Sequence, residues 1–147
     1  MQGVRPLSWK KKLEPLSNFD IEKAARVLPN FRGVFMRDSL PTAVHDKECG
    51  VVNLDSNNGD GTHWVAYKID RDQFSIDQDK DGPSAVYFDS FGLDPPRELV
   101  RYLSCPIRTQ TFQLQGPNDV ICGHLCLLVL KELAAGRKFE DIILKLC

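Results

Sequence analysis

The longest helical pattern in the chain, at residues 119–135, follows a series of short strand patterns, and this order limits the folds open to the chain. Strands are expected at residues 31–35, 49–54, 63–69, 85–89 and 107–114. Shorter helices are expected at residues 18–28, 95–103 and 139–146. Because strands and helices are mixed without regular alternation, the sequence predicts an α+β fold.

Local signals suggest where two of these helices begin and end. Asn18 can cap the first helix, and Pro29 is expected to end it. Asn118 or Asp119 can cap the longest helix, and Gly136 is a typical stop signal. Cys122 is therefore expected about three residues inside the longest helix.

The bulk composition predicts one ordinary globular domain over residues 1–147, with residues 1–16 irregular. A net charge of −1 gives no whole-chain field that would favour nucleic acid. The basic residues of the N-terminal segment form either a solvated terminus or a weak nucleic-acid contact; they are Arg5, Lys10, Lys11 and Lys12. No apolar run approaches the ~20 residues of a membrane helix, so we expect no membrane partner.

The five cysteines argue against a disulfide framework, because their number is odd and no secretory signal precedes them. They are Cys49, Cys105, Cys122, Cys126 and Cys147. The sequence therefore predicts an intracellular, reducing compartment. Thiols in such a chain are buried filler, metal ligands or a nucleophile.

Cys122 is the candidate nucleophile because it lies near the start of the longest helix. Free amides and the helix dipole favour negative charge there, and so lower the pKa of a thiol. Gly123 is expected to leave room for a substrate backbone. Taken alone, the position of Cys122 favours a buried structural cysteine, because cysteine is among the most buried residue types and the helix beyond it is apolar. Cys126 lies one turn deeper, where the dipole effect has faded, so we assign it to packing.

His63 and Asp89 are the candidate base and its orienting acid. His63 enters a strand directly from a loop, whereas His45 lies in a proline-containing loop and His124 faces another side of the helix. Asp89 ends a later strand. If the two strands are antiparallel neighbours, the two side chains meet, and the carboxylate can fix the tautomer of the imidazole. The alternatives are a structural histidine and an ordinary turn aspartate.

Gln115 lies seven positions before Cys122, across a Gly-Pro turn. Its side-chain amide could join the backbone N–H of Cys122 as a donor to an oxyanion.

These residues lie in motifs that resemble the adenovirus protease (adenain) family. GTHWVAY at 61–67 resembles its histidine motif, YFDSFG at 87–92 its acidic motif, and LQGPNDVICGHLC at 114–126 its glutamine–cysteine block. The likeness covers about residues 18–135 and includes FRGVF at 31–35. The more distant SUMO and ubiquitin-like-protein proteases share the same site logic, and related sequences occur in virus-like DNA transposons.

The resemblance implies a papain-like cysteine protease with permuted chain order. A central mixed or antiparallel sheet would be packed by a long helix that carries the nucleophile at its N-terminus. His63, Asp89, Gln115 and Cys122 would be the catalytic residues, with no cofactor and no metal. The chain ends soon after the cysteine helix, which puts a cofactor-peptide surface in doubt, and the loop between Ile69 and Ser84 is longer than the family pattern.

Two metal-binding patterns compete weakly with this interpretation. Residues 77–82 imitate the start of a calcium-binding loop, but its twelfth position is Phe88 instead of glutamate. A zinc site would use His45, Cys49, Cys122 and Cys126, whose spacings lack the tight Cys-x-x-Cys pattern.

The sequence therefore predicts a thiol protease of adenain type whose partners are protein or peptide substrates. The resemblance implies precursor proteins of a virus or virus-like element, cut at small Gly-containing sites, as the substrates. It also implies the cytoplasm or nucleus of a host cell, or a virion, as the location. The alternatives are a deconjugating protease for SUMO or another ubiquitin-like protein, and a catalytically idle binding module on the same fold.

Overall fold

Five strands form one mixed sheet in the order β1-β2-β3-β4-β5, which is also their order along the chain. The structure is a computed structural model, and it describes residues 14–55, 63–71, 84–110, 113–114 and 121–146. The strands are β1 (Phe31–Met36), β2 (Lys47–Asn53), β3 (Trp64–Asp70), β4 (Ala85–Phe88) and β5 (Ile107–Thr109). The helices are α2 (Asn18–Ala25), α4 (Arg97–Leu103), α5 (Cys122–Ala134) and α6 (Phe139–Leu146). The α+β class and the mixed central sheet predicted from the sequence are confirmed.

β3 runs antiparallel to both of its neighbours, β2 and β4. The edge strands β1 and β5 run parallel to β2 and β4, respectively. β3 is the central strand, and β2 and β4 lie on its two sides. The register pairs Asn53 with Trp64 and Ala66 with Phe88. The end of β2, the start of β3 and the end of β4 therefore meet at one rim of the sheet.

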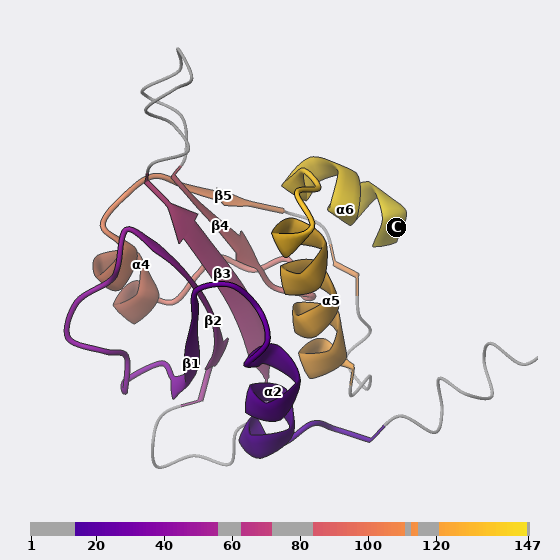
Figure 1. The fold of residues 1–147 in the computed structure, drawn as a ribbon, viewed down its shortest axis with the longest axis horizontal. Coiled ribbons are helices and arrows are strands. Elements are labelled where there is room, and N and C mark those ends of the chain that lie inside the picture. The colour runs from indigo at the N-terminus through magenta and orange to yellow at the C-terminus, as the bar shows by residue number, and fades with distance from the viewer. Residues whose placement is uncertain (1–13, 56–62, 72–83, 111–112, 115–120, 147) are drawn as a thin grey trace, which may run out of the picture.

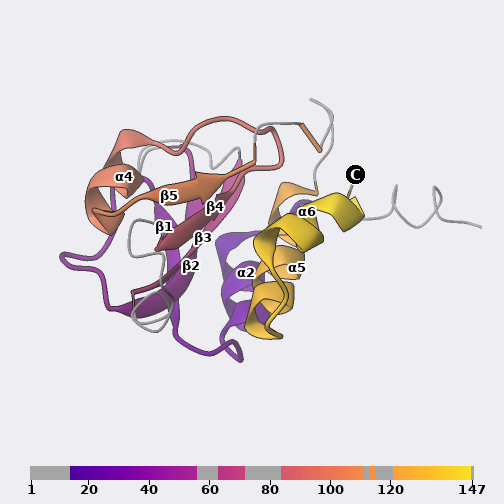
Figure 2. The same ribbon diagram turned by 90° about the horizontal axis from the view of Figure 1, so that it is seen from above.

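Both faces of the sheet are covered, as Figures 1 and 2 show. Helices α2, α5 and α6 lie on one face, and α4 lies on the other. Alternate side chains of each strand point to opposite faces, and because both faces are covered, β2 and β3 are buried almost throughout. The first face buries Val51, Trp64, Ala66 and Phe88 with Cys126 and Leu130, and the second buries Val52, Val65, Tyr67 and Tyr87 with Leu99 and Leu103.

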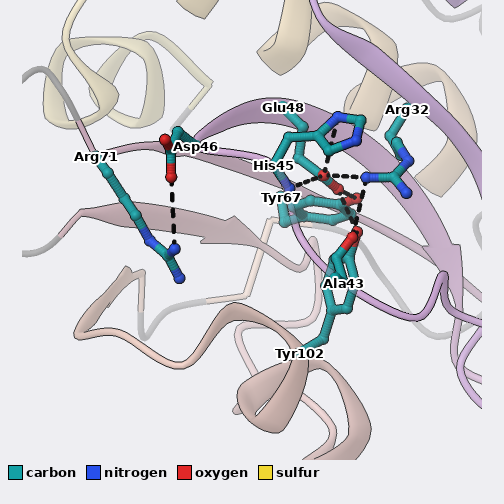
Figure 3. Close-up of polar contacts among 8 residues, drawn as sticks. All are labelled: Arg32, Ala43, His45, Asp46, Glu48, Tyr67, Arg71 and Tyr102. Carbon is teal, nitrogen blue, oxygen red and sulfur yellow. Dashed lines mark hydrogen bonds and ion pairs between the residues drawn. The ribbon is translucent and has the colours of Figure 1, made fainter.

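The buried carboxylate of Glu48 connects the sheet to α4 and to the chain before β2 through hydrogen bonds (Figure 3). Glu48 accepts hydrogen bonds from Arg32 Nη1 at 2.9 Å, from the His45 backbone N–H at 2.8 Å, and from two tyrosine hydroxyls. The hydroxyls are those of Tyr67 at 2.5 Å and Tyr102 at 2.7 Å. Burial opposes the charge of Glu48, but these four donors outweigh it and hold its pKa below the usual 4.5.

The helix ends differ in part from the sequence prediction. Ser17, and not Asn18, caps α2, because its side chain accepts the Asp20 N–H and the Asp20 side chain accepts the Ser17 N–H in return. Helix α2 ends at Ala25, four residues before Pro29. For α5, the predicted C-terminal end is correct. Ala135 and Gly136, with φ of +89°, end the helix as expected.

The start of α5 was placed too early in the sequence prediction. The helix begins at Cys122, and its N-cap residue is Ile121, which makes no side-chain cap. The predicted caps, Asn118 and Asp119, lie outside the described residues. Strand β5 is shorter than expected, because β4 offers it partners only from Ala85 to Tyr87. The chain leaves the sheet after Thr109, and Gln110 turns its side chain toward the carbonyl of Asp89.

Within the described residues, no helix is long and apolar enough to cross a membrane. The same residues contain no group of three or more side chains suited to a metal ion. The polar contacts of His45 and Cys49 do not involve Cys122. The backbone N–H of His45 donates to Glu48, and the Cys49 thiol lies 3.8 Å from the carbonyl of Pro29. The zinc grouping considered from the sequence is therefore not assembled. The calcium-like loop at 77–82, the basic residues Arg5, Lys10, Lys11 and Lys12, and Cys147 lie outside the described residues.

Candidate active site

His63 and Asp89 meet at the rim where β3 begins and β4 ends. His63 immediately precedes β3 and Asp89 immediately follows β4, and the two strands are antiparallel neighbours. His63 Nε2 lies 2.6 Å from Asp89 Oδ1, and both side chains are buried. The structure thus brings together the pair that the sequence predicted, by the antiparallel route it assumed.

The turn after β4 fixes the carboxylate of Asp89. The backbone N–H of Phe91 donates to Asp89 Oδ1 at 2.8 Å, so this oxygen accepts both Phe91 and His63. The carbonyl of Asp89 accepts the N–H of Gly92 at 2.7 Å and the side-chain amide of Gln110. Gly92 has φ of +73°, a conformation that side-chain-bearing residues adopt rarely. A glycine is therefore needed for the turn that aims the carboxylate.

Phe91 contributes its ring as well as its backbone. The ring centroids of Phe91 and His63 are 4.2 Å apart, and the ring planes differ by 14°. The imidazole is consequently held on one edge by Asp89 and on one flat face by Phe91. The sequence analysis did not single out Phe91, although this residue belongs to the quoted acidic motif, YFDSFG at 87–92.

Cys122 is the first residue of α5, so its backbone N–H belongs to the group of helix N–H groups that lack an intrahelical acceptor. Its Sγ lies 3.5 Å from the backbone nitrogen of Trp64, which donates to it. The imidazole of His63 and the N–H of Gly123 also act on this side chain and lower its pKa. Because Asp89 occupies Nε2, the ring nitrogen left for the thiol is Nδ1.

These contacts favour charge separation between the thiol and the imidazole. Burial disfavours a charged Cys122, yet the hydrogen bonds from His63 and Trp64 and the attraction of His63 outweigh it and lower the thiol pKa below 9.0. Burial also disfavours a charged His63, but its bonds to Asp89 and Cys122 raise its pKa to about 9. The two shifts point to a thiolate–imidazolium pair.

The other cysteines that the structure describes have the opposite character. Burial raises the pKa of Cys49 to about 11, raises that of Cys126 well above 9.0, and raises that of Cys105. Cys126 is completely buried in the core between α5 and the sheet. Its packing role, inferred from its depth in the helix, agrees with this environment.

Gly123 has a different role from the one predicted. It is buried, and a side chain at this position would meet Leu16, Trp64 and Ile21 at 3.3–3.4 Å. The missing side chain lets α5 approach β3 closely and does not open space for a substrate. Trp64 supports the same junction, because its Nε1 donates to the carbonyl of Leu16 at 3.1 Å.

Gln115, the predicted oxyanion donor, lies outside the described residues. Its neighbour Leu114 is described, and the Leu114 N–H donates to the carbonyl of Ser90 at 2.7 Å. Leu114 therefore lies next to the Asp89 turn, and Ile121, directly before Cys122, is the next described residue.

Two solved structures resemble this fold. A crystal structure of the ASFV pS273R protease matches with a TM-score of 0.56 and 18% identity, over 88% of this chain and 61% of that chain. A Se-Met crystal structure of the same protease matches with a TM-score of 0.46 and 21% identity, over 67% of this chain and 38% of that chain. This chain thus spans less than two thirds of the protease it resembles.

No protein-family model matches the sequence, and no curated protein resembles it significantly. The likeness in structure supports the papain-like protease architecture expected from the sequence.

Proposed function

We propose that this chain is a cysteine peptidase in which Cys122 is the nucleophile, His63 the general acid and base, and Asp89 the orienting acid. The observation that carries the proposal is the buried His63–Asp89 hydrogen bond at the rim where the Trp64 N–H donates to Cys122 Sγ, the first residue of α5. The lowered thiol pKa and the raised imidazole pKa agree with it. A thiol used only for packing would share the raised pKa of Cys126.

In the first half of the reaction, the thiolate of Cys122 attacks the carbonyl carbon of a peptide bond and forms a C–S bond. The imidazolium of His63 then gives its proton from Nδ1 to the leaving amine as the C–N bond breaks. Asp89 holds Nε2–H and stabilises the imidazolium.

In the second half, a water molecule attacks the thioester. His63, now neutral, takes a proton from this water at Nδ1, and the C–S bond breaks to release the acid product. The expelled thiolate of Cys122 again faces a protonated imidazole. One water is consumed for each peptide bond hydrolysed, and the chain returns to its starting ionisation state.

Both halves pass through a tetrahedral oxyanion that needs hydrogen-bond donors. The backbone N–H of Cys122 is one donor, since it is at the helix start. We assign the second to the side-chain amide of Gln115. The position of Leu114 supports this assignment, because its N–H donates to the carbonyl of Ser90, the residue after Asp89.

For the substrate, we propose precursor proteins of a virus or virus-like element, cut at small Gly-containing sites by an adenain-type endopeptidase. The three ordered motifs at 61–67, 87–92 and 114–126 support this choice. A lowered thiol pKa also suits a reducing compartment, which keeps Cys122 unoxidised. The N-terminal basic residues Arg5, Lys10, Lys11 and Lys12 remain candidates for a weak nucleic-acid contact.

The test uses two kinds of electrophilic probe on the wild-type protein and on Cys122→Ala. A peptidyl-glycine vinyl sulfone should label the wild type at Cys122 and leave Cys122→Ala unlabelled. Vinyl sulfones built on intact SUMO or ubiquitin should react far more slowly. Faster reaction with the folded probes would identify a deconjugating protease. Failure of every probe, with a folded protein, would leave a binding module and overturn the proposal.

A further inference from the structure

A surface pocket of about 450 Å³ lies at the sheet rim beside His63, on the face that α4 covers. Its walls come from the end of β2, from the chain that follows the Asp89 turn, and from the first residues of α4. Pockets that bind small ligands or side chains commonly have volumes of roughly 300–1,000 Å³. The mechanism above does not use this pocket.

Two lining residues of the pocket, Leu54 and Leu93, lie close to His63 across the sheet and to Phe91 along the chain, respectively. The N–H of Leu54 donates to the carbonyl of His63 at 2.9 Å, one step beyond the Asn53–Trp64 pair. Leu54 and His63 are therefore directly opposed on antiparallel strands, and their side chains project toward the same face. On the other side, Leu93 lies two residues after Phe91, whose ring stacks on the imidazole.

The pocket lining combines apolar side chains with charges that balance. Leu54, Leu93 and Pro96 supply its apolar surface, and Leu93 is 61% exposed. The two arginines, Arg37 and Arg97, are matched by Asp94 and Glu98, and Arg37 forms an ion pair with Glu98 at 2.7 Å. Such a lining favours an uncharged apolar group over an acidic or basic one.

The mechanism indicates which part of a substrate reaches the pocket. After acylation, the amino-terminal product stays on Cys122, whereas the leaving amine must lie within hydrogen-bond reach of His63 Nδ1. The residues that follow the scissile bond therefore depart past the imidazole. The pocket begins at Leu54, which opposes His63, and it continues to the first residues of α4.

We propose that this pocket binds an aliphatic side chain of the substrate on the carboxyl side of the scissile bond, and that Leu93 is its main specificity-determining residue. The proposal rests on the peptidase function. It adds a selective site for the leaving portion of the substrate, and it predicts that cleavage efficiency depends on residues beyond the bond that is cut.

The experiment digests a proteome-derived peptide library with the full chain and aligns the cut sites by mass spectrometry. We expect an enrichment of Leu, Ile, Val or Met at one position after the cut. A synthetic pair with Leu or Ser at that position should differ about tenfold in kcat/KM, the range for one apolar side chain in a pocket.

Leu93→Ser should reduce this difference to less than about threefold, while the rate of Cys122 alkylation stays unchanged. Leu144→Ser is the matched control, because Leu144 is 70% exposed on α6 and lies away from the pocket. Cleavage with no preference after the cut, or with a preference that Leu93→Ser leaves intact, would overturn this proposal alone. Absence of any cleavage, despite normal alkylation of Cys122, would overturn the peptidase function with it.

Discussion

The imidazole of His63 lies almost parallel to the ring of Phe91, with centroids 4.2 Å apart and an angle of 14° between the planes. Phe91 also donates its backbone N–H to Asp89 Oδ1, the carboxylate oxygen that hydrogen-bonds to His63 Nε2. A side-chain substitution at position 91 removes the stacking and leaves the backbone bond available, so the two contributions can be separated.

Phe91→Leu should lower the pKa of His63, because an aromatic face stabilises an adjacent cation by about 0.5–2 kcal/mol. The imidazole would also gain rotational freedom. We expect kcat/KM to fall roughly threefold to thirtyfold, which corresponds to that range. The measurement is the pH profile of peptide cleavage, whose high-pH limb should move to lower pH. Phe91→Tyr should restore it. Equal profiles for the leucine and wild-type proteins would show that Phe91 has only a packing role.

The pH dependence of activity follows from the two shifted groups. The pKa of His63 is raised to about 9 and that of Cys122 is lowered from 9.0, so the ion pair exists between these two values. Activity should therefore decline as the pH rises through about 9, because neutral His63 has no proton for the leaving amine. The raised pKa also means that the contribution of His63 to folding is complete below 6.5 and is lost as the pH rises through about 9.

Asp89→Asn serves as the variant for this pH test, because asparagine keeps a hydrogen-bond acceptor and loses the charge. Its decline in activity should begin at lower pH than that of the wild type, and its maximum rate should also be reduced. An unchanged high-pH limb in Asp89→Asn would contradict the assignment of that limb to His63.

Cys122→Ala and Cys126→Ala should separate reactivity from packing. Cys122→Ala should abolish both peptide turnover and rapid iodoacetamide labelling. Cys126→Ala should keep most of the activity and lose about 1 kcal/mol of stability, since a small cavity forms in the core. Labelling followed by peptide mapping identifies the reactive thiol. A similar loss of activity and labelling in both variants would argue against Cys122 as the nucleophile.

The buried carboxylate of Glu48 is the test of the scaffold. Glu48→Gln weakens four hydrogen bonds and leaves Arg32 without its anion, so the free energy of unfolding at pH 7 should fall by about 3 kcal/mol. Urea unfolding measures this loss. Because the pKa of Glu48 is lowered, its stabilising effect is present above 4.5 and disappears as the pH falls further. The difference between wild type and Glu48→Gln should therefore shrink in acid.

Glu140→Gln is the control for Glu48→Gln. Glu140 pairs with Arg108 at the surface, where both side chains are about half exposed, and such pairs contribute about 0–1 kcal/mol. A loss in Glu48→Gln no larger than in Glu140→Gln would mean that the buried network contributes little to stability.

The sequence predicted the meeting of His63 and Asp89 because strand patterns fix both position and face. Once β3 and β4 pair as antiparallel neighbours, the start of one strand must lie beside the end of the other. The start of α5 was less predictable, because Asn118 and Asp119 are good caps by composition, yet the helix begins three residues after Asp119 without a side-chain cap. Helix starts depend on tertiary contacts that a local motif does not contain.

Other features depend on contacts between distant segments. Gly123 suggested open space, whereas the approach of Leu16, Trp64 and Ile21 decides its role. The stacking of Phe91 depends on the path of the chain after Asp89, for which Gly92 was the available local signal. Glu48 was detectable only as a charge next to an apolar strand pattern, and its four donors come from separate elements and loops.

Gln115 provides the sharpest kinetic test of the proposed oxyanion site. Its side chain is neutral and not nucleophilic, so hydrogen bonding is its only use in the reaction. Gln115→Ala should lower kcat by roughly 10²–10³-fold, the usual effect of losing one such donor, with little change in KM. Alkylation of Cys122 by iodoacetamide should keep its rate, because alkylation forms no oxyanion. If Gln115 instead supports only the turn before α5, Cys122 would be misplaced, and alkylation and turnover would fall in parallel. Both rates measured on one sample of Gln115→Ala therefore distinguish a donor from a structural brace.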